Sequence, residues 1–112
     1  MVNEVLQKAI DDNLLEIFEN TPLDEILHEL YANGVLSEGE VDILRKVSRK
    51  VWQISEFIKI LRTKADKDYE KFYKALIQHH DPAAISLGKK LRTYCNADEA
   101  GIYFAHTLIR AF

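Results

Sequence analysis

The chain has 112 residues, of which 47% are hydrophobic and 29% charged, and its formal net charge is −3. This composition is typical of one globular domain and excludes a disordered chain. No apolar run reaches the roughly 20 residues of a membrane-spanning helix, and the N-terminal stretch lacks the features of a signal peptide. The single cysteine, Cys95, excludes an internal disulfide, and no Cys or His spacing matches a zinc site, which together indicate a reducing intracellular compartment.

Apolar residues recur at helical spacing along nearly the whole chain, whereas strictly alternating apolar and polar stretches are absent. The first helix is expected at about residues 2–19. Thr21 is expected to cap the second helix, with Pro22 at its first position and Asn33 and Gly34 at its stop. Further helices are expected at about residues 38–47, 49–65, 67–79 and 82–94, with an amphipathic segment at 96–112. These seven helices have short connections, which favour antiparallel neighbours in an all-helical bundle.

Capping patterns or stop signals mark three further helix starts. Ser37 and Glu40 form a capping-box pattern, in which each side chain bonds the backbone N–H of the other residue. Asn96 and Glu99 repeat the pattern for the last segment. Asp81 followed by Pro82 marks the end of one helix and the start of the next.

Charge is distributed unevenly along the chain. Residues 1–42 contain eleven acidic side chains and one basic side chain, Lys8, whereas residues 43–112 contain fourteen basic and seven acidic side chains. Two clusters of opposite sign follow from this distribution. The acidic patch consists of Asp24, Glu25, Glu29, Glu38, Glu40 and Asp42, and the basic patch consists of Arg45, Lys46, Arg49, Lys50, Lys59 and Arg62.

For any single charged residue, solvation of a helix surface is the ordinary explanation. The clustering into two patches of opposite sign indicates a role in association. The acidic patch is expected to gather at the corner after Gly34, because a tight connection brings two helix ends together there. The basic patch is expected to cross the end of the third helix and the fourth helix. Patches of opposite sign on different faces suit head-to-tail association, which is heterologous and can propagate into a ring or a filament.

Trp52 lies roughly 140° from the centre of the apolar stripe of the fourth helix, at ~100° per residue. It is a candidate interface anchor, because tryptophan is favoured at binding hot spots. The more ordinary expectation is that the first helix or the C-terminal segment covers it.

No catalytic, metal or cofactor site is expected. His79, His80 and Asp81 invite a metal or acid-base interpretation, but adjacent helical residues point ~100° apart and no third ligand is apparent. A solvated helix end is therefore expected there. Cys95 and His106 suggest a nucleophile and its base, but they belong to no recognised motif, and a glycine-rich phosphate loop is absent. The chain is thus expected not to be an enzyme.

Three stretches carry a resemblance to a known family. Residues 30–44, LYANGVLSEGEVDIL, resemble the end of helix two and the acidic start of helix three in caspase recruitment domains (CARDs), the helical interaction modules of apoptotic and inflammatory signalling. Residues 54–76, ISEFIKILRTKADKDYEKFYKAL, are similar to the fourth and fifth helices of the family, and residues 83–91, AAISLGKKL, to its sixth. Two features depart from the pattern: Ala65 stands where the family usually has glycine, and residues 96–112 lie beyond its six helices.

The resemblance implies a six-helix antiparallel Greek-key bundle, the death fold, at residues 1–94, with residues 95–112 as a C-terminal helical extension or the start of a downstream region. It implies homotypic assembly with another CARD-containing protein, such as a caspase prodomain or an adaptor, or with a second copy of this chain. The setting would be cytoplasmic pathways of apoptosis, inflammation or innate immunity. Whether the parent protein is an adaptor, a caspase or a sensor stays open.

The resemblance also implies which surfaces bind, because family members pair an acidic surface of helices two and three with a basic surface of helices one and four. In this chain the first helix offers only Lys8, so the basic side would depend mainly on the fourth helix. Neither a membrane nor a nucleic acid is implied as a partner.

Two other functions remain as alternatives. The short turn and the basic helix after it would suit a helix-turn-helix nucleic-acid-binding domain, but phosphate would be repelled by the net charge of −3 and by the acids on the turn. The second alternative is a structural helical subdomain whose acidic and basic faces pack within a larger protein.

Overall fold

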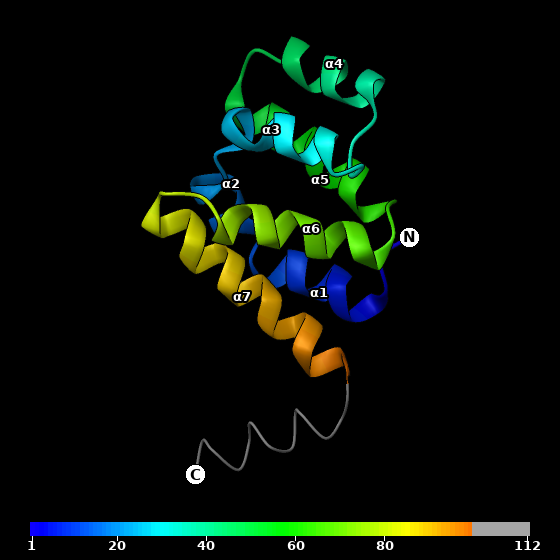
Figure 1. The fold of residues 1–112 in the computed structure, drawn as a ribbon, viewed down its shortest axis with the longest axis vertical. Helices are drawn as coiled ribbons and strands as arrows, with labels where there is room; N and C mark the ends of the chain where they lie inside the picture. The colour runs from blue at the N-terminus through cyan, green and yellow to red at the C-terminus, as the bar shows by residue number, and fades with distance from the viewer. Residues whose placement is uncertain (100–112) are drawn as a thin grey trace.

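The computed structural model describes residues 1–99, and side chains as far as Cys95. The regular structure of these residues is helical throughout, which confirms the expected all-helical bundle (Figure 1). The helices are α1 (Glu4–Asp12), α2 (Leu14–Asn20), α3 (Leu23–Ala32), α4 (Glu38–Lys46), α5 (Lys50–Arg62), α6 (Asp66–Ile77) and α7 (Pro82–Glu99).

Helix α6 occupies the middle of the bundle, with α3 on one side and α7 on the other (Figure 1). Helix α7 also packs on α1 and α2, while α4 packs on α3 and α5. The core is continuous across these contacts: the rings of Phe57 on α5 and Phe72 on α6 meet edge to face with centroids 5.0 Å apart. The buried Tyr69 hydroxyl donates to the Leu91 carbonyl at 2.7 Å and so joins α6 to α7.

The expectation of a single first helix at residues 2–19 is wrong, because the helix is interrupted at Asn13 and forms α1 and α2. The Asn13 side-chain amide donates to the Ala9 carbonyl at 2.8 Å, and its backbone N–H donates to the same oxygen at 3.2 Å. An asparagine side chain that bonds the backbone in this way competes with helix continuation. After the break Ile17 is buried, but Leu15 leaves 70% of its surface exposed.

The two ends of α3 differ in how well the sequence predicts them. Gly34 adopts a left-handed φ of 80°, and the Val35 N–H then donates to the Leu30 carbonyl at 2.9 Å, which ends the helix as expected. The expected cap at Thr21 is wrong. Thr21 is fully buried, and within the described part of the chain its hydroxyl has no hydrogen-bond partner.

Side-chain caps begin α4 and α6. The Ser37–Glu40 capping box is confirmed: the Glu40 N–H donates to the Ser37 hydroxyl at 3.1 Å, and the Ser37 N–H donates to the Glu40 carboxylate at 2.9 Å. At the start of α6, Asp68 accepts a hydrogen bond from the Ala65 N–H at 3.1 Å. Ala65 has φ −81° and ψ 163°, an extended conformation that any residue adopts. The absence of glycine at this position therefore causes no strain.

Helix α5 buries an apolar stripe of Ile54, Phe57, Ile58 and Leu61, and near its start it buries a polar side chain as well. Gln53 is buried and donates to the Leu44 carbonyl at 3.0 Å, which ties the start of α5 to the end of α4. Val51, in the first turn of the same helix, is 57% exposed.

Helix α7 begins at Pro82 as expected, with the Asp81 carboxylate accepting from the Ala83 N–H at 3.1 Å. The expected end near residue 94 is wrong, because α7 continues to Glu99 and a new helix start at Asn96 is not present. The remainder of the expected segment at 96–112 lies outside the described residues. No described helix has the length and apolar character needed to cross a membrane.

Candidate protein-interaction surfaces

Four residues of the predicted basic patch surround the short connection between α4 and α5. These are Arg45, Lys46, Arg49 and Lys50, all exposed, and we call them the basic corner. Arg45 and Lys46 lie in the last turn of α4, where positive charge is favoured by the helix dipole. Arg49 and Lys50 lie at the start of α5, where the same dipole disfavours them, and no acidic residue occupies that first turn. Helix stability therefore does not explain this pair.

Trp52 follows the basic corner on α5 and is 59% exposed. The expectation that the first helix covers it is wrong, since α1 and α2 leave it open, and the C-terminal segment at 100–112 lies outside the described residues. Val51 beside it and Ile43 on α4 are also more than half exposed. Of these three, tryptophan is the residue type that is enriched at binding hot spots.

The other two residues of the basic patch, Lys59 and Arg62, lie near the opposite end of α5, about 15 Å and about 20 Å from Arg49 at 1.5 Å per residue. Both have partners within the molecule. Lys59 contacts the Glu56 carboxylate at 3.2 Å. Arg62 donates to the Gln7 side chain at 2.7 Å and to the Asp11 carboxylate at 2.5 Å, which holds α5 against α1. The predicted basic patch is thus divided: among the described residues, Lys59 and Arg62 have ion-pair partners and the basic corner has none.

Two acids of the acidic patch are likewise committed. Glu25 contacts the His79 ring at 2.6 Å, and Glu40 accepts from the Lys64 ammonium at 2.8 Å in addition to its capping bond. Burial alone would raise the pKa of Glu40, but the hydrogen bonds from Lys64 and Ser37 outweigh it, and that pKa is lowered.

The four remaining acids, Asp24, Glu29, Glu38 and Asp42, form no ion pair with any described residue, and we call them the open acids.

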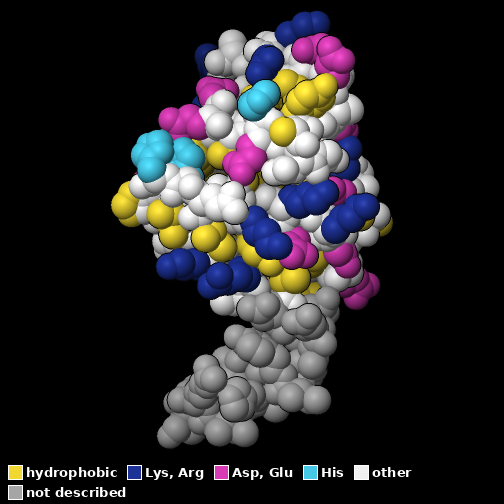
Figure 2. All heavy atoms as spheres, viewed as in Figure 1, with side chains coloured by type: hydrophobic (Ala, Val, Ile, Leu, Met, Phe, Trp, Pro, Cys, Tyr) yellow, Lys and Arg dark blue, Asp and Glu magenta, His cyan; other side chains and the backbone are white. Residues whose placement is uncertain are grey.

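The acidic patch does not gather at one corner. Asp24 and Glu25 begin α3, about 12 Å from the corner at Gly34, because the helix rises 1.5 Å per residue. One surface hollow is lined by Pro22, Leu23, Asp24, Glu25, Lys50 and Gln53, and another by His28, Tyr31, Glu38, Val41, Asp42 and Arg45. Each hollow therefore holds acids together with one base of the basic corner. Figure 2 shows the same mixture, with acidic and basic side chains interleaved across the face in view.

Although acidic and basic side chains line the same hollows, the two patches do not neutralise each other within the described residues. Within the described residues, no ion pair joins a member of the acidic patch to a member of the basic patch. The partners of the committed residues, such as Lys64 for Glu40 and Asp11 for Arg62, come from outside both patches. Among the described residues, the basic corner and the open acids are therefore both without an ion-pair partner.

The structure describes only some of the candidate catalytic and metal-binding side chains. Cys95 is half-buried near the end of α7, and its suggested base His106 lies outside the described residues. His79, expected at a solvated helix end, has only 9% of its side chain exposed, so that expectation is wrong for this residue.

A helical bundle with charges of both signs beside exposed apolar side chains is an architecture that suits a protein-interaction domain. The family model of the caspase recruitment domain matches residues 7–89, from α1 into α7. The chain belongs to the CARD family, whose members bind other CARDs. Searches of curated proteins and of solved structures each gave no match.

Proposed function

We propose that this CARD assembles head to tail, with the basic corner of one molecule bound to the open acids of the next. The partner is a second copy of this chain or the CARD of a caspase prodomain or adaptor, in apoptotic or inflammatory signalling. The observation that carries the proposal is the pair Arg49 and Lys50, exposed at a helix start where the dipole disfavours them and unpaired with any described acid.

The strength of such a contact is limited. An exposed ion pair contributes about 0 to 1 kcal/mol and is screened by salt, so a few pairs give weak association between isolated domains. Tethering many copies on a platform raises their effective concentration and converts weak contacts into stable assembly. This is the behaviour expected of a module that recruits proteins only when its own copies are brought together.

Head-to-tail contact makes a prediction that mixing can test. Arg49→Glu with Lys50→Glu removes the basic side, and Glu38→Lys with Asp42→Lys removes the acidic side. Each variant alone should be monomeric by sedimentation velocity at low salt, where the unsubstituted chain self-associates. An equimolar mixture should form 1:1 dimers and nothing larger, because one intact basic corner meets one intact set of open acids.

The matched control is Lys67→Glu with Lys89→Glu, which makes the same change in charge at exposed positions of α6 and α7. This control should assemble like the unsubstituted chain, and all variants should keep the same helical circular-dichroism signal. Self-association of the basic-side variant, or a mixture that stays monomeric while the control assembles, would contradict the proposal.

A further inference from the structure

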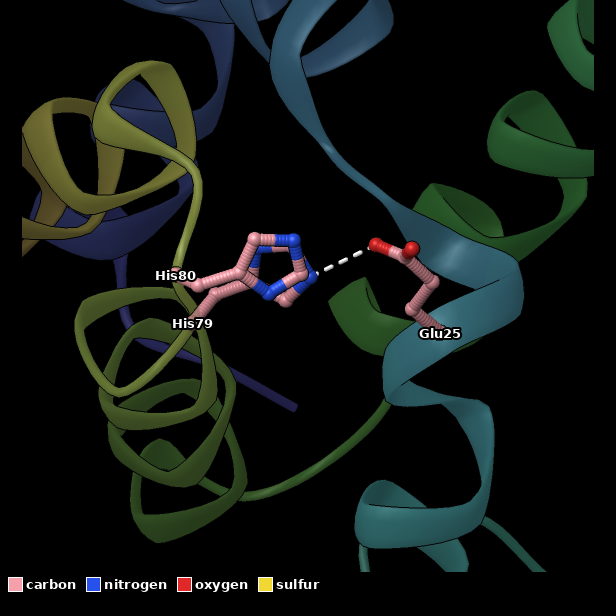
Figure 3. A group of neighbouring side chains, drawn as sticks. All are labelled: Glu25, His79 and His80. Carbon is pink, nitrogen blue, oxygen red and sulfur yellow. Dashed lines mark hydrogen bonds and ion pairs between the residues drawn. The ribbon is translucent and has the colours of Figure 1, made fainter.

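The connection between α6 and α7 brings two histidines against a carboxylate of α3 (Figure 3). His79 Nε2 lies 2.6 Å from Glu25 Oε2, and the His79 and His80 rings stack with centroids 4.2 Å apart and planes 26° from parallel. One potential ligand atom from each of the three residues lies within 4.8 Å of the other two. The third donor comes from 54 positions away in the sequence.

We propose that Glu25, His79 and His80 form a binding site for a divalent transition-metal ion of the Zn²⁺ type. Two imidazoles and one carboxylate are a donor set that zinc accepts, and they leave at least one coordination position for water. The hard ions Mg²⁺ and Ca²⁺ prefer oxygen donors alone and are not expected to bind. The objection that neighbouring helical histidines diverge does not apply, because both lie beyond the end of α6 at Ile77 and their rings stack.

The geometry requires one adjustment for metal to enter. Zinc bonds of about 2.0–2.2 Å at a tetrahedral angle place two ligand atoms about 3.3 Å apart, so the contact between His79 and Glu25 must widen. Glu25 can supply this movement, because 57% of its side chain is exposed, whereas the His79 ring is held by burial with 9% exposed. The His79 imidazole is therefore fixed in place, and the Glu25 carboxylate is the group that moves to admit a metal ion.

The protonation of His79 follows from its second contact. The Asp81 N–H donates to His79 Nδ1 at 3.1 Å, so the ring proton is on Nε2, shared with Glu25. A metal ion on Nε2 replaces that proton, and Nδ1 then becomes the protonated nitrogen and loses its bond from Asp81. The loss of this hydrogen bond makes the expected affinity lower than that of a preformed structural zinc site.

The site has a consequence for assembly that rests on the proposed function. Glu25 lines the same hollow as Asp24, one of the open acids. A bound divalent ion adds two positive charges beside Asp24, which weakens its attraction for a basic corner. Metal binding would therefore reduce head-to-tail association.

Calorimetric titration of Zn²⁺ into the metal-free full chain tests the site. We expect one ion per chain, with affinity reduced at least tenfold in both His80→Ala and Glu25→Gln, because loss of even an outer-shell partner costs about 10–100-fold. His28→Ala, Glu29→Gln and Cys95→Ser are matched controls: they remove another histidine, another acid of α3 and the only cysteine, and should bind normally. His80 and Glu25 are exposed, so these substitutions should leave the helical signal unchanged.

Absence of Zn²⁺ binding, or equal affinity in His80→Ala and the unsubstituted chain, would overturn the site. Loss of binding in Cys95→Ser would overturn it as well, since it would assign the metal elsewhere. The effect on assembly is measured separately, as sedimentation with and without Zn²⁺. Confirmed zinc binding with unchanged assembly would leave the site in place and contradict only its link to the proposed function.

Discussion

The carboxylate of Glu40 makes two contacts that stabilise the fold, a capping hydrogen bond and an ion pair. It caps α4 through the Ser37 N–H, and the same oxygen accepts from Lys64, which lies between α5 and α6. The side chains of Glu40 and Lys64 are each only 25% exposed, which makes this ion pair less screened than one on the open surface. Because these contacts favour the charged form, the pKa of Glu40 is lowered despite its burial.

Glu40→Gln should therefore destabilise the domain in a pH-dependent manner. Glutamine at this position can still complete a capping box, so the substitution removes the charge and little else. A lowered folded-state pKa stabilises the fold above the ordinary glutamate value of 4.5, and this contribution is lost as pH falls through the lower folded-state value. We expect a loss of about 1 kcal/mol in urea unfolding at neutral pH and almost none well below pH 4.5. The neighbouring Glu38→Gln should change stability less, and an equal loss for Glu40→Gln at both pH values would count against this explanation.

Between elements, α6 and α7 approach each other closely at Gly88. An added Cβ at this buried position of α7 would lie 2.8 Å from both the Tyr73 carbonyl oxygen and Cγ1 of Ile77. The carbonyl belongs to the backbone of α6, so relief requires the two helices to separate. Gly88 thus permits the contact between α6 and α7.

Gly88→Ala should lower the free energy of unfolding even though alanine is the better helix former. The propensity gain is about 1 kcal/mol, whereas overpacking typically costs about 1–3 kcal/mol, and backbone contact places this site toward the upper end. Gly39→Ala is the matched control, because its Cβ would meet only the Ser37 hydroxyl at 4.0 Å, and it should be neutral or stabilising. Thermal unfolding of both variants measures the difference in stability. A Gly88→Ala domain as stable as the Gly39→Ala domain would contradict the close packing at Gly88.

Helix ends with unambiguous local signals were predictable from the sequence, whereas weak local signals and contacts between distant residues were missed. The Ser37–Glu40 box and the turn at Gly34 involve residues close in the chain, and both are confirmed. The break at Asn13 was missed because an asparagine inside an apolar helical pattern carries no unambiguous stop signal. The contact between Glu25 and His79 spans 54 positions, and no periodicity within one helix reveals such a pair.

The same distinction applies to the interaction surfaces. The sequence supplies both patches by residue type, but only the fold shows that Arg62 is held by Gln7 and Asp11 while Arg49 has no acidic partner among the described residues. Burial of the polar Gln53 was also hidden from an apolar pattern. Trp52 lies far from the centre of the apolar stripe of α5, at ~100° per residue, and is 59% exposed.

At the scale of the whole molecule, assembly needs more than charge. Ion pairs in the head-to-tail contact are exposed and weaken with salt, so they mainly set orientation and the rate of encounter. Durable association requires apolar surface that becomes buried between molecules. Trp52 and Val51, which directly follow the basic corner on α5, offer such surface at the position where the partner acids would dock.

Trp52→Ala should therefore separate folding from assembly. With 59% of Trp52 exposed, truncation should change stability by no more than about 0.5 kcal/mol, the range of ordinary surface substitutions. Loss of a hot-spot tryptophan costs about 2 kcal/mol or more in binding, which corresponds to about 30-fold weaker association by sedimentation equilibrium. Trp52→Phe should keep most of the affinity, because it retains an aromatic ring at the contact. A large fall in melting temperature for Trp52→Ala would instead assign the side chain to the core, and unchanged association would remove it from the interface.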